Sequence, residues 1–503
     1  MSDNTLVAPR NGIHYLDHQI DGINWMMGRE LATAPVCRGG ILGDDMGLGK
    51  TFQTIGLLKN SPLQLRTLIV CPPALVAGWL EELRACGYCP RTLMAGSSEW
   101  TPVQEADIDK ESVWLTTYPK ICMYRASIAR SAFARVILDE GHVIRNGKET
   151  SRWMAAMAIA KKADCRWILS ATPVQNGYHD WRNLCWWLRV RCPSSEIPEL
   201  GPVLMLRRTM DELRGEIEAL PPPPRFVLHD LNIPETGVTM AEARLFRALC
   251  DQLQNAMESR TVSALMKLEL YMRIQQFLVH PQIYIESMRG KFRGAYPRPD
   301  WNGSATKWSA CMAEMEAGVA AGEGTIIFCN FRSEMDRVEE AARATGAAVF
   351  CIRGGMGVEK VGAAVTGARE AAAAGRPVVV VVQIVSGGAG LNLQFCRRVL
   401  FLSQHWNPAV VHQAVGRAVR IGQKAVVEVH LFRIVDDVLD NLDRRMVEVH
   451  RGKIDRAQEI CDTLYEGYPP LVTIPGGEAR DRDTESDPES SASRQSPQPE
   501  PVS

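Results

Sequence analysis

The chain has 503 residues, of which 46% are hydrophobic and 23% charged, and its formal net charge is −1. That length allows two or three domains with sizeable cores. No apolar run reaches the roughly 18 residues of a membrane span, and residues 1–10 lack the basic stretch and apolar core of a signal peptide. The balanced charge does not point to a nucleic acid, although a basic groove depends on local clustering rather than on net charge.

The 14 cysteines are scattered, and many lie within apolar segments. Buried, unpaired thiols are typical of a reducing compartment. Cys86 and Cys89 form a lone CxxC pair, and no second ligand pair follows at zinc spacing. We therefore expect no zinc site at this pair.

Short apolar runs rich in Val and Ile recur along most of the chain and predict β-strands, because each is bounded by polar residues, Gly or Pro. Helix-like segments separate these runs. The alternation predicts parallel sheets that are covered by helices on both faces. The predicted strands lie at 67–71, 112–116, 135–138, 167–169, 325–329, 377–383, 399–402 and 426–432.

The middle of the chain breaks this pattern. Residues 221–224 are four prolines, which fit neither a helix nor a central strand. From Thr239 to about His280 the apolar residues recur at helical spacing, and Thr239 with Glu242 matches a capping box. These features predict an α/β lobe, a helical insertion and a second α/β lobe, followed by a disordered tail rich in Ser, Pro, Glu and Asp. The expected boundaries are 1–220, 221–300, 301–475 and 476–503.

A phosphate-binding loop is predicted at Gly47-Leu48-Gly49-Lys50-Thr51, which follows the apolar run 40–42 and precedes a helix-like run. Glycines let the backbone approach a phosphate closely, and the N–H groups of the following helix point at it. Lys50 would contact the β- and γ-phosphates, and Thr51 would hold Mg²⁺. Asp44 stands where the strict pattern has Gly, so the motif alone also fits a glycine-rich turn without function.

An acid pair, Asp139 and Glu140, follows the predicted strand at 135–138. Acids at the carboxyl end of a parallel strand face the crevice where nucleotides bind. Asp139 would coordinate Mg²⁺ through water, and Glu140 would orient and deprotonate the attacking water. An N-cap for the next helix is the alternative, but the upstream GxGKT motif favours the catalytic interpretation.

Gln413, Arg417 and Arg420 are spaced at i, i+4 and i+7, which predicts that they share one helical face in the second lobe. Guanidinium groups suit the negative charge of a γ-phosphate in its transition state, and their supply from a second lobe would couple hydrolysis to closure of the cleft. A solvated basic face is the alternative.

The small hydroxyls of Ser170 and Thr172 follow another predicted strand and could sense the γ-phosphate. An ordinary turn before a helix is the alternative.

The order of these motifs resembles that of superfamily 2 helicases, and several details resemble the SWI/SNF-type helicase-like ATPases. Leu16-Asp17-His18-Gln19 is similar to that family's adenine-side motif, with His18 where Tyr is usual. Leu206-Arg207-Arg208-Thr209, Trp406-Asn407-Pro408 and Arg420-Ile421-Gly422-Gln423 are similar to further signatures of the family. Segments 40–51, 139–142, 170–176, 386–393 and 413–423 resemble helicase motifs I, II, III, V and VI.

The resemblance implies two RecA-like lobes, of which 1–220 binds ATP and 301–475 is the helicase C-terminal lobe. It implies ATP and Mg²⁺ as cofactors, with Mg²⁺ held by Thr51 and Asp139. It also implies catalytic roles for Lys50, Asp139, Glu140, Gln413, Arg417 and Arg420. The implied nucleotide contacts are Gln19, Asp45, Gly47, Leu48, Gly49, Lys50, Thr51 and Gly390.

The family resemblance further implies a monomeric motor on double-stranded DNA that acts on nucleosomes or other DNA-bound proteins. We expect a nuclear location in a eukaryote and a cytoplasmic one otherwise. Candidate DNA contacts are Pro72-Pro73, Trp79, Thr116-Thr117-Tyr118, Asn330-Phe331-Arg332 and Ser386-Gly387-Gly388.

The acidic motif DEGH and the turn SATPVQN most resemble the branch of the family that acts in postreplication and excision repair. Members of that branch often carry a RING finger, yet no Cys/His cluster lies between Asn176 and Lys307, so we do not expect ubiquitin-ligase activity. An N-terminal DNA-end-binding module is also not expected. We predict a DNA-dependent ATPase that translocates along double-stranded DNA. The alternatives are a strand-separating DExH helicase on DNA or RNA, and a catalytically silent scaffold.

Overall fold

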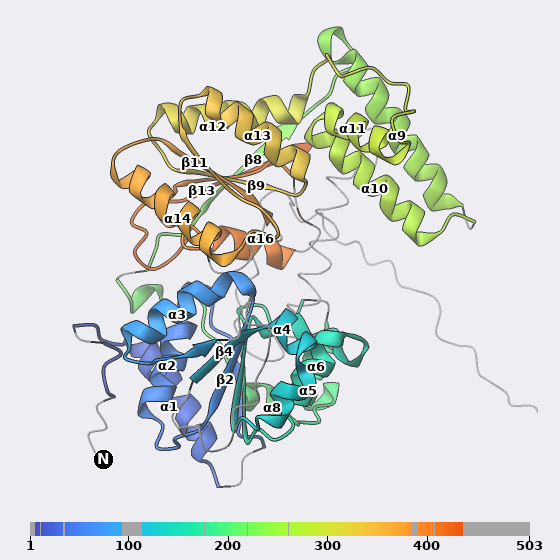
Figure 1. Cartoon of the computed structure of the whole chain (residues 1–503). Helices are drawn as coiled ribbons and strands as arrows, with labels where there is room; N and C mark the ends of the chain where they lie inside the picture. The colour runs from blue at the N-terminus through green and yellow to red at the C-terminus, as the bar shows by residue number, and fades with distance from the viewer. Residues whose placement is uncertain are drawn as a thin grey trace, which may run out of the picture. The chain divides into compact units, whose positions relative to one another are not determined.

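The computed structural model describes residues 6–10, 12–33, 36–92, 113–175, 177–218, 220–259, 261–384, 391–403, 405 and 408–435. Within these ranges the strands form two sheets, and every pairing between neighbouring strands is parallel (Figure 1). The predicted parallel α/β architecture is therefore confirmed. The tail expected at 476–503 lies outside the described residues.

The strand order of the first sheet gathers three functional turns at one edge. The order is β3-β4-β2-β5-β6-β1-β7, so β5, β6 and β1 are neighbours. Because they are parallel, the loop after β1, the acid pair after β5 and Ser170 after β6 leave from the same edge. The strands are β1 (Gly39–Leu42), β2 (Thr67–Cys71), β3 (Arg91–Thr92), β4 (Val113–Thr117), β5 (Arg135–Asp139), β6 (Cys165–Leu169) and β7 (Met205–Leu206).

Helices cover both faces of the first sheet (Figure 1). Successive strand residues point to opposite faces, so Leu68 and Val70 pack into one core cluster while Ile69 and Cys71 pack into the other. The first cluster includes α4 (Tyr118–Met123), α5 (Arg125–Arg130), α6 (Ser151–Ile159), α7 (Tyr178–Trp187) and α8 (Ile197–Leu204), and the second includes α1 (Asp17–Leu31), α2 (Lys50–Asn60) and α3 (Val76–Ala85). Short 3₁₀ turns lie at Pro73–Leu75, Gly141–Ile144, Gly147–Glu149, Ser194–Glu196, Glu212–Gly215 and Gly237–Thr239.

The second sheet has the order β10-β11-β9-β12-β13-β8. Its edge strand β8 (Arg225–Leu231) directly follows the four prolines, so part of the linker expected at 221–300 pairs in this sheet. The apolar-run criterion missed β8 because this edge strand is only partly buried. The other elements are α12 (Thr306–Ala320), β9 (Thr325–Cys329), α13 (Arg332–Ala344), β10 (Ala348–Ile352), α14 (Val358–Ala373), β11 (Val378–Gln383), β12 (Arg398–Phe401), α16 (Pro408–Val415) and β13 (Glu428–Ile434).

Three helices, α9 (Met240–Glu258), α10 (Ala264–Val279) and α11 (Pro281–Lys291), form the helical insertion (Figure 1). The predicted capping box at its start is wrong. The Thr239 hydroxyl donates to the carbonyls of Pro234 and Thr236, at 2.6 and 3.0 Å. The Glu242 carboxylate accepts instead from Thr306 N at 2.9 Å, so it caps α12, which is distant in sequence.

The cysteines in the described ranges are free thiols, as expected. None of the helices in these ranges combines the length and the apolar character that a membrane span requires.

A buried ion pair joins α1 to the centre of the first sheet. Arg135 on β5 donates to Glu30 through Nε at 2.7 Å and through Nη2 at 2.5 Å. The indole of Trp167 on β6 donates to the same carboxylate at 2.9 Å. Glu30 is inaccessible to solvent and Arg135 is 1% exposed, so each charge depends on the other for compensation.

We predict that Glu30→Gln lowers the free energy of unfolding by about 3–5 kcal/mol, because it leaves the Arg135 guanidinium buried without a counter-charge. Chemical denaturation followed by far-UV circular dichroism measures the change. Asp211→Asn is the matched control, because Asp211 pairs with Arg214 at the surface and such pairs contribute about 0–1 kcal/mol. Equal losses in the two variants would contradict the prediction.

Candidate nucleotide site

The loop between β1 and α2 has the backbone geometry of a phosphate cradle. Gly47 and Gly49 have φ values of 91° and 82°, in the left-handed region that favours glycine. A Cβ atom on Gly49 would lie 2.4 Å from Gln19 Nε2, so any other residue would be strained by this φ and would also displace the Gln19 side chain. Helix α2 begins at Lys50, and its first N–H groups therefore face the loop. This geometry matches the phosphate-binding loop predicted from residues 47–51.

The Lys50 ammonium lies within this loop. Its Nζ donates to the carbonyl oxygens of Asp44 and Asp45, at 2.6 and 3.0 Å. Burial lowers the pKa of Lys50, while the nearby carboxylates of Glu140, Asp44, Asp45 and Asp139 oppose that shift. A cation surrounded by four acids is well placed to meet phosphate oxygens.

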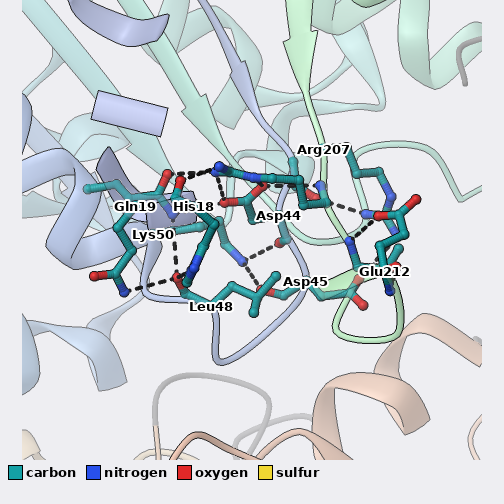
Figure 2. A network of polar contacts seen from close by, with 12 residues as sticks. His18, Gln19, Asp44, Asp45, Leu48, Lys50, Arg207 and Glu212 are labelled. Carbon is teal, nitrogen blue, oxygen red and sulfur yellow. Dashed lines mark hydrogen bonds and ion pairs between the residues drawn. The ribbon is translucent and has the colours of Figure 1, made fainter. Parts of the chain in front are cut away.

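Asp44, which departs from the strict loop pattern, has a structural partner. Its buried carboxylate accepts from Arg208 Nη2 at 2.6 Å and from Gln53 Nε2 at 2.8 Å. Asp45 accepts from Arg207 Nη2 at 3.2 Å, so two consecutive ion pairs fix the loop to the segment after β7 (Figure 2). A glycine at position 44 would leave the backbone flexible where the loop begins. The two ion pairs instead hold this part of the loop in one conformation.

His18 and Gln19 at the start of α1 contact the same loop (Figure 2). The ring of His18 lies 2.9 Å from the Leu48 carbonyl through Nε2, and Gln19 Nε2 donates to that carbonyl at 3.4 Å. Burial lowers the pKa of His18, which keeps the imidazole neutral. Both side chains support the loop, and the adenine contact expected for Gln19 stays a prediction.

The acid pair lies at the carboxyl end of β5. Asp139 Oδ2 accepts from the indole Nε1 of Trp79 at 2.7 Å, and the Tyr118 hydroxyl donates to the Asp139 carbonyl at 2.9 Å. Glu140 has a φ of 52°, so the backbone turns sharply after Asp139. Both carboxylates are thereby held in place beside Lys50.

The environment separates the pKa values of the two acids. Burial and the charge of Glu140 raise the pKa of Asp139 to about 7, while the Trp79 hydrogen bond acts in the opposite direction. Burial would raise the pKa of Glu140 too, but the hydrogen bond from His142 and the charges of His142, Arg417 and Lys50 bring it below its usual value. Glu140 is therefore ionised at neutral pH, as a general base requires.

A chain of polar contacts leads from Glu140 to the second lobe. His142 Nδ1 lies 3.2 Å from Glu140 Oε2 and 3.2 Å from Ser170 Oγ. The Ser170 hydroxyl accepts from Thr172 N at 3.3 Å, and Gln413 Nε2 donates to Thr172 Oγ1 at 3.4 Å. The predicted sensing turn and Gln413 are thus in contact.

Arg417 and Arg420 do not share a helical face with Gln413, so that prediction is wrong. Helix α16 ends at Val415, before Gly416, and both arginines lie in the turns that follow. Glycine disfavours helix continuation, and Arg420 Nε donates back to the Gly416 carbonyl at 2.9 Å. The turns still bring both guanidinium groups under the influence of the Glu140 charge.

Motif VI also lies directly against the phosphate loop. A Cβ atom on Gly47 would lie 3.5 Å from Arg420 Cα, and one on Gly416 would lie 3.1 Å from Met46 Sδ. Any side chain at position 416 would therefore crowd Met46. Arg417 is 1% exposed, and burial together with the charge of Arg420 lowers its pKa.

The donor set fits Mg²⁺. The Thr51 hydroxyl, at the first turn of α2, and the Asp139 carboxylate are hard oxygen ligands on neighbouring elements. A divalent cation would displace the proton that burial holds on Asp139. Thr51 and Asp139 therefore remain our proposed Mg²⁺ ligands.

Some predicted residues fall outside the described part of the chain. Gly390, the segment 386–388 and Trp406-Asn407 lie there, so their roles remain predictions. Of the candidate DNA contacts, Arg332 is exposed and Pro72, Asn330 and Phe331 are partly so. Trp79 and Tyr118 are buried against Asp139, so the structure contradicts a direct DNA contact by these two side chains.

The sequence does not reveal the positioning roles of three side chains, Trp79, Arg207 and Arg208. It offers Trp79 as a candidate DNA contact and places Arg207 and Arg208 in the family signature Leu206-Arg207-Arg208-Thr209. The signature does not indicate which residues the two arginines bind, because the ion pairs with Asp44 and Asp45 join residues more than 160 positions apart.

We predict that Trp79→Phe reduces the rate of ATP hydrolysis roughly tenfold or more and raises the Mg²⁺ concentration it requires. The substitution removes a hydrogen bond to a carboxylate, which contributes about 1.5–3 kcal/mol. A Mg²⁺ titration of steady-state hydrolysis measures both effects. Trp186→Phe is the control, because Trp186 is 37% exposed. An unchanged Mg²⁺ dependence in Trp79→Phe would contradict the assigned role.

The raised pKa of Asp139 predicts a pH-dependent stability. Its folded value of about 7 lies above the ordinary 3.8, so its contribution is fully present below about pH 4 and is lost as pH rises through about 7. Asp139→Asn removes this loss, and we expect it to raise the thermal unfolding midpoint at pH 8 but not at pH 4. Differential scanning calorimetry without Mg²⁺ or nucleotide measures the midpoints, with Asp211→Asn as the exposed control. Equal midpoints at pH 8 would refute the shift.

Comparison with known families agrees with this geometry. The model of the SNF2-related domain matches residues 18–196, and the model of the helicase conserved C-terminal domain matches residues 307–422. The first match contains the phosphate loop and the acid pair, and the second contains Gln413, Arg417 and Arg420.

Individual relatives are similar at low identity. A probable global transactivator of Orgyia pseudotsugata multicapsid polyhedrosis virus is 26% identical over 483 residues, covering 90% of this chain and 92% of the relative. The ISWI chromatin-remodeling complex ATPase CHR11 of Arabidopsis thaliana is 25% identical over 461 residues, covering 83% of this chain and 40% of the relative. A SWI/SNF-related matrix-associated actin-dependent regulator of chromatin, subfamily A member 1, of Mus musculus is 25% identical, covering 86% and 42%.

Among solved structures, the Sulfolobus solfataricus SWI2/SNF2 ATPase core in complex with dsDNA is 22% identical, covers 92% of this chain and 97% of that chain, and has a TM-score of 0.37. The chain spans less than half the length of the two remodelling relatives. From the two family matches and the site that they enclose, the chain belongs to the SWI/SNF-type helicase-like family of DNA-dependent ATPases within superfamily 2.

Proposed function

We propose that this chain is an ATP-dependent translocase on double-stranded DNA that displaces or remodels proteins bound to it. The observation that carries the proposal is the meeting of charges at Glu140. Its carboxylate, 13% exposed, interacts with Lys50 of its own lobe and with Arg417 and Arg420 of the other. Such a site is complete only when both lobes contribute to it.

In the proposed reaction, Lys50 binds the β- and γ-phosphates and Glu140 accepts the proton of the attacking water. The low pKa of Glu140 keeps it ready as a base. Mg²⁺, held by Thr51 and Asp139, would neutralise phosphate charge. Arg417 and Arg420 would stabilise the charge that develops on the γ-phosphate as the bond to the leaving group breaks.

The contact from Gln413 to Thr172 supports a coupling between hydrolysis and motion. Loss of the γ-phosphate would change the environment of Glu140, and His142 and Ser170 connect Glu140 to Thr172. Since Gln413 of the second lobe donates a hydrogen bond to Thr172, a change at the acid pair would alter this contact between the lobes. Alternating grip of the two lobes would then move the motor along DNA.

DNA binding is proposed through backbone phosphates, because contacts to phosphates give affinity without reading sequence. Arg332 and Asn330 at the carboxyl end of β9 are the strongest candidates in the described second lobe, and Pro72-Pro73 follows β2 in the first. The names of the relatives refer to chromatin remodelling and transactivation, which supports a DNA-bound protein as the target.

We further propose that the motor works as a monomer, in the nucleus of a eukaryote or the cytoplasm of a bacterium, where its DNA track lies. Action in DNA repair is proposed from the DEGH and SATPVQN motifs alone. Strand separation is the second candidate function, and the motor geometry described above is common to both.

The test is steady-state ATP hydrolysis with double-stranded DNA, single-stranded DNA and RNA in parallel, together with displacement of a third strand from a DNA triplex. We expect the greatest stimulation by double-stranded DNA, and triplex displacement without unwinding of a duplex that carries an overhang. Stimulation by RNA alone, or unwinding of that duplex, would overturn the proposal.

Two variants separate the catalytic residues from the scaffold interpretation. Lys50→Ala and Glu140→Gln are each expected to reduce hydrolysis at least about 100-fold, in line with the loss of a directly catalytic group. Glu140→Gln should retain ATP binding, measured with a fluorescent nucleotide analogue. Glu218→Gln is the control, because Glu218 lies outside the site. Turnover that both variants leave unchanged would show that the activity belongs to another protein.

A further inference from the structure

Three metal-ligand side chains meet in the second lobe, on the face of the sheet that α12 covers. His229 on β8 lies opposite Phe432 on β13, and His430 precedes Phe432 by two residues. Both histidines therefore point to the same face, since strand residues alternate. Phe432 packs into the core cluster that contains α12, and Glu314 projects from α12 toward the two rings. The mechanism described above uses none of the three.

Their ligand atoms form a triangle of the size that a tetrahedral metal ion needs. His229 Nε2 lies 2.9 Å from His430 Nδ1, and the Glu314 carboxylate lies 3.9 Å from the first nitrogen through Oε1 and 3.5 Å from the second through Oε2. Metal–ligand bonds of about 2.0–2.1 Å at tetrahedral angles separate neighbouring ligands by about 3.3 Å. Small rotations of the rings would bring all three atoms to that separation.

The two imidazoles are suited to bind a cation. Their facing nitrogens are at hydrogen-bond distance and share one proton, which a metal ion would replace. His430 is 3% exposed, so its ring is largely shielded from solvent. His229 stacks on Phe432 with ring centroids 4.5 Å apart, which limits its rotation.

The surrounding charges hold the carboxylate and balance an added cation. Arg398 Nη1 donates to Glu314 Oε2 at 2.6 Å, which leaves Oε1 directed at His229. Glu323 and Glu428 lie 3.2 and 3.7 Å from the same guanidinium and offset its charge. His430 Nε2, the ring nitrogen that faces away from the triangle, lies 3.3 Å from Arg398 Nη1 and 3.5 Å from Glu428 Oε2. A metal ion at Nδ1 would place the ring proton on Nε2, where Glu428 would accept it in place of the Arg398 contact and orient the ring.

We propose that His229, His430 and Glu314 form a binding site for a divalent transition metal, with Zn²⁺ as the best fit and water as the fourth ligand. Two nitrogen ligands and one oxygen ligand favour Zn²⁺ over Mg²⁺, which prefers six oxygens. The ion would fasten the edge strand β8 to β13 and α12. Since β8 follows the linker from the first lobe, the metal would stabilise the connection on which force between the lobes depends.

The experiment uses the full chain, stripped with a chelator and titrated with Zn²⁺ and then with Co²⁺. We expect one Zn²⁺ per chain by elemental analysis after gel filtration, a raised thermal unfolding midpoint, and a Co²⁺ spectrum of a tetrahedral site. His229→Gln and Glu314→Gln should weaken binding by at least about tenfold to 100-fold. Both positions are partly exposed, so these variants are expected to fold.

His14→Gln is the matched control, because His14 is exposed in the first lobe, and it should bind Zn²⁺ unchanged. Absence of stoichiometric binding, equal binding in His229→Gln, or a thiolate-to-cobalt charge-transfer band that assigns the metal to cysteines would each overturn the proposal. Lys50→Ala should bind Zn²⁺ normally while losing ATP hydrolysis, so failure of the metal site and failure of the proposed motor function are distinguishable.

Discussion

The nucleotide site depends on the mutual compensation of buried charges. Asp139 and Arg417 are buried and Lys50 and Glu140 are partly buried, and an isolated ion in such a place would be costly. Each acid lies near a cation and each cation near an acid, so removal of Lys50 or Glu140 would leave a neighbouring charge without its partner. The same arrangement divides the roles of the two adjacent acids, because His142 and Arg417 act on Glu140 and keep it ionised while burial raises the pKa of Asp139 to about 7.

This compensation also explains why the site spans two lobes. In the first lobe alone, Asp44 and Asp45 pair with Arg208 and Arg207, so Lys50 is left to face Glu140 and Asp139. Arg417 and Arg420 of the second lobe add positive charge near Glu140, and the phosphates of ATP would attract that charge. Under the proposed function, approach of the second lobe is favoured when the γ-phosphate is present and less favoured when it leaves. A motor needs such a dependence of lobe contact on the nucleotide state.

Much of the fold and of the nucleotide site could be predicted from the sequence. The predictions that were wrong or missing have physical reasons. The strand ends were predictable because Val- and Ile-rich runs stop where polar turns begin, and parallel topology then places the loop after β1 and Asp139 at one edge. The ion pair between Asp44 and Arg208 was not predictable, because the sequence alone does not show which distant cation an acid pairs with. Glu242 illustrates the same limit, since it matched a local capping box but binds Thr306. Helical spacing misplaced Arg417 and Arg420 because Gly416 ends α16 before them.

The proline run and β8 suggest how motion passes between the lobes. Residues 221–224 have fixed φ angles and donate no backbone hydrogen bonds, so this linker is stiff rather than extensible. Directly after it, β8 is held at both ends by ion pairs, from Arg225 to Glu428 and from Asp230 to Arg433 at 2.7 Å, with His229 against His430 between them. An edge strand with only one neighbour would otherwise be the weakest place for a pull to act. Under the proposed function, these polar contacts lie where a stiff linker would deliver the force of a closing cleft, and they would resist separation of β8 from β13.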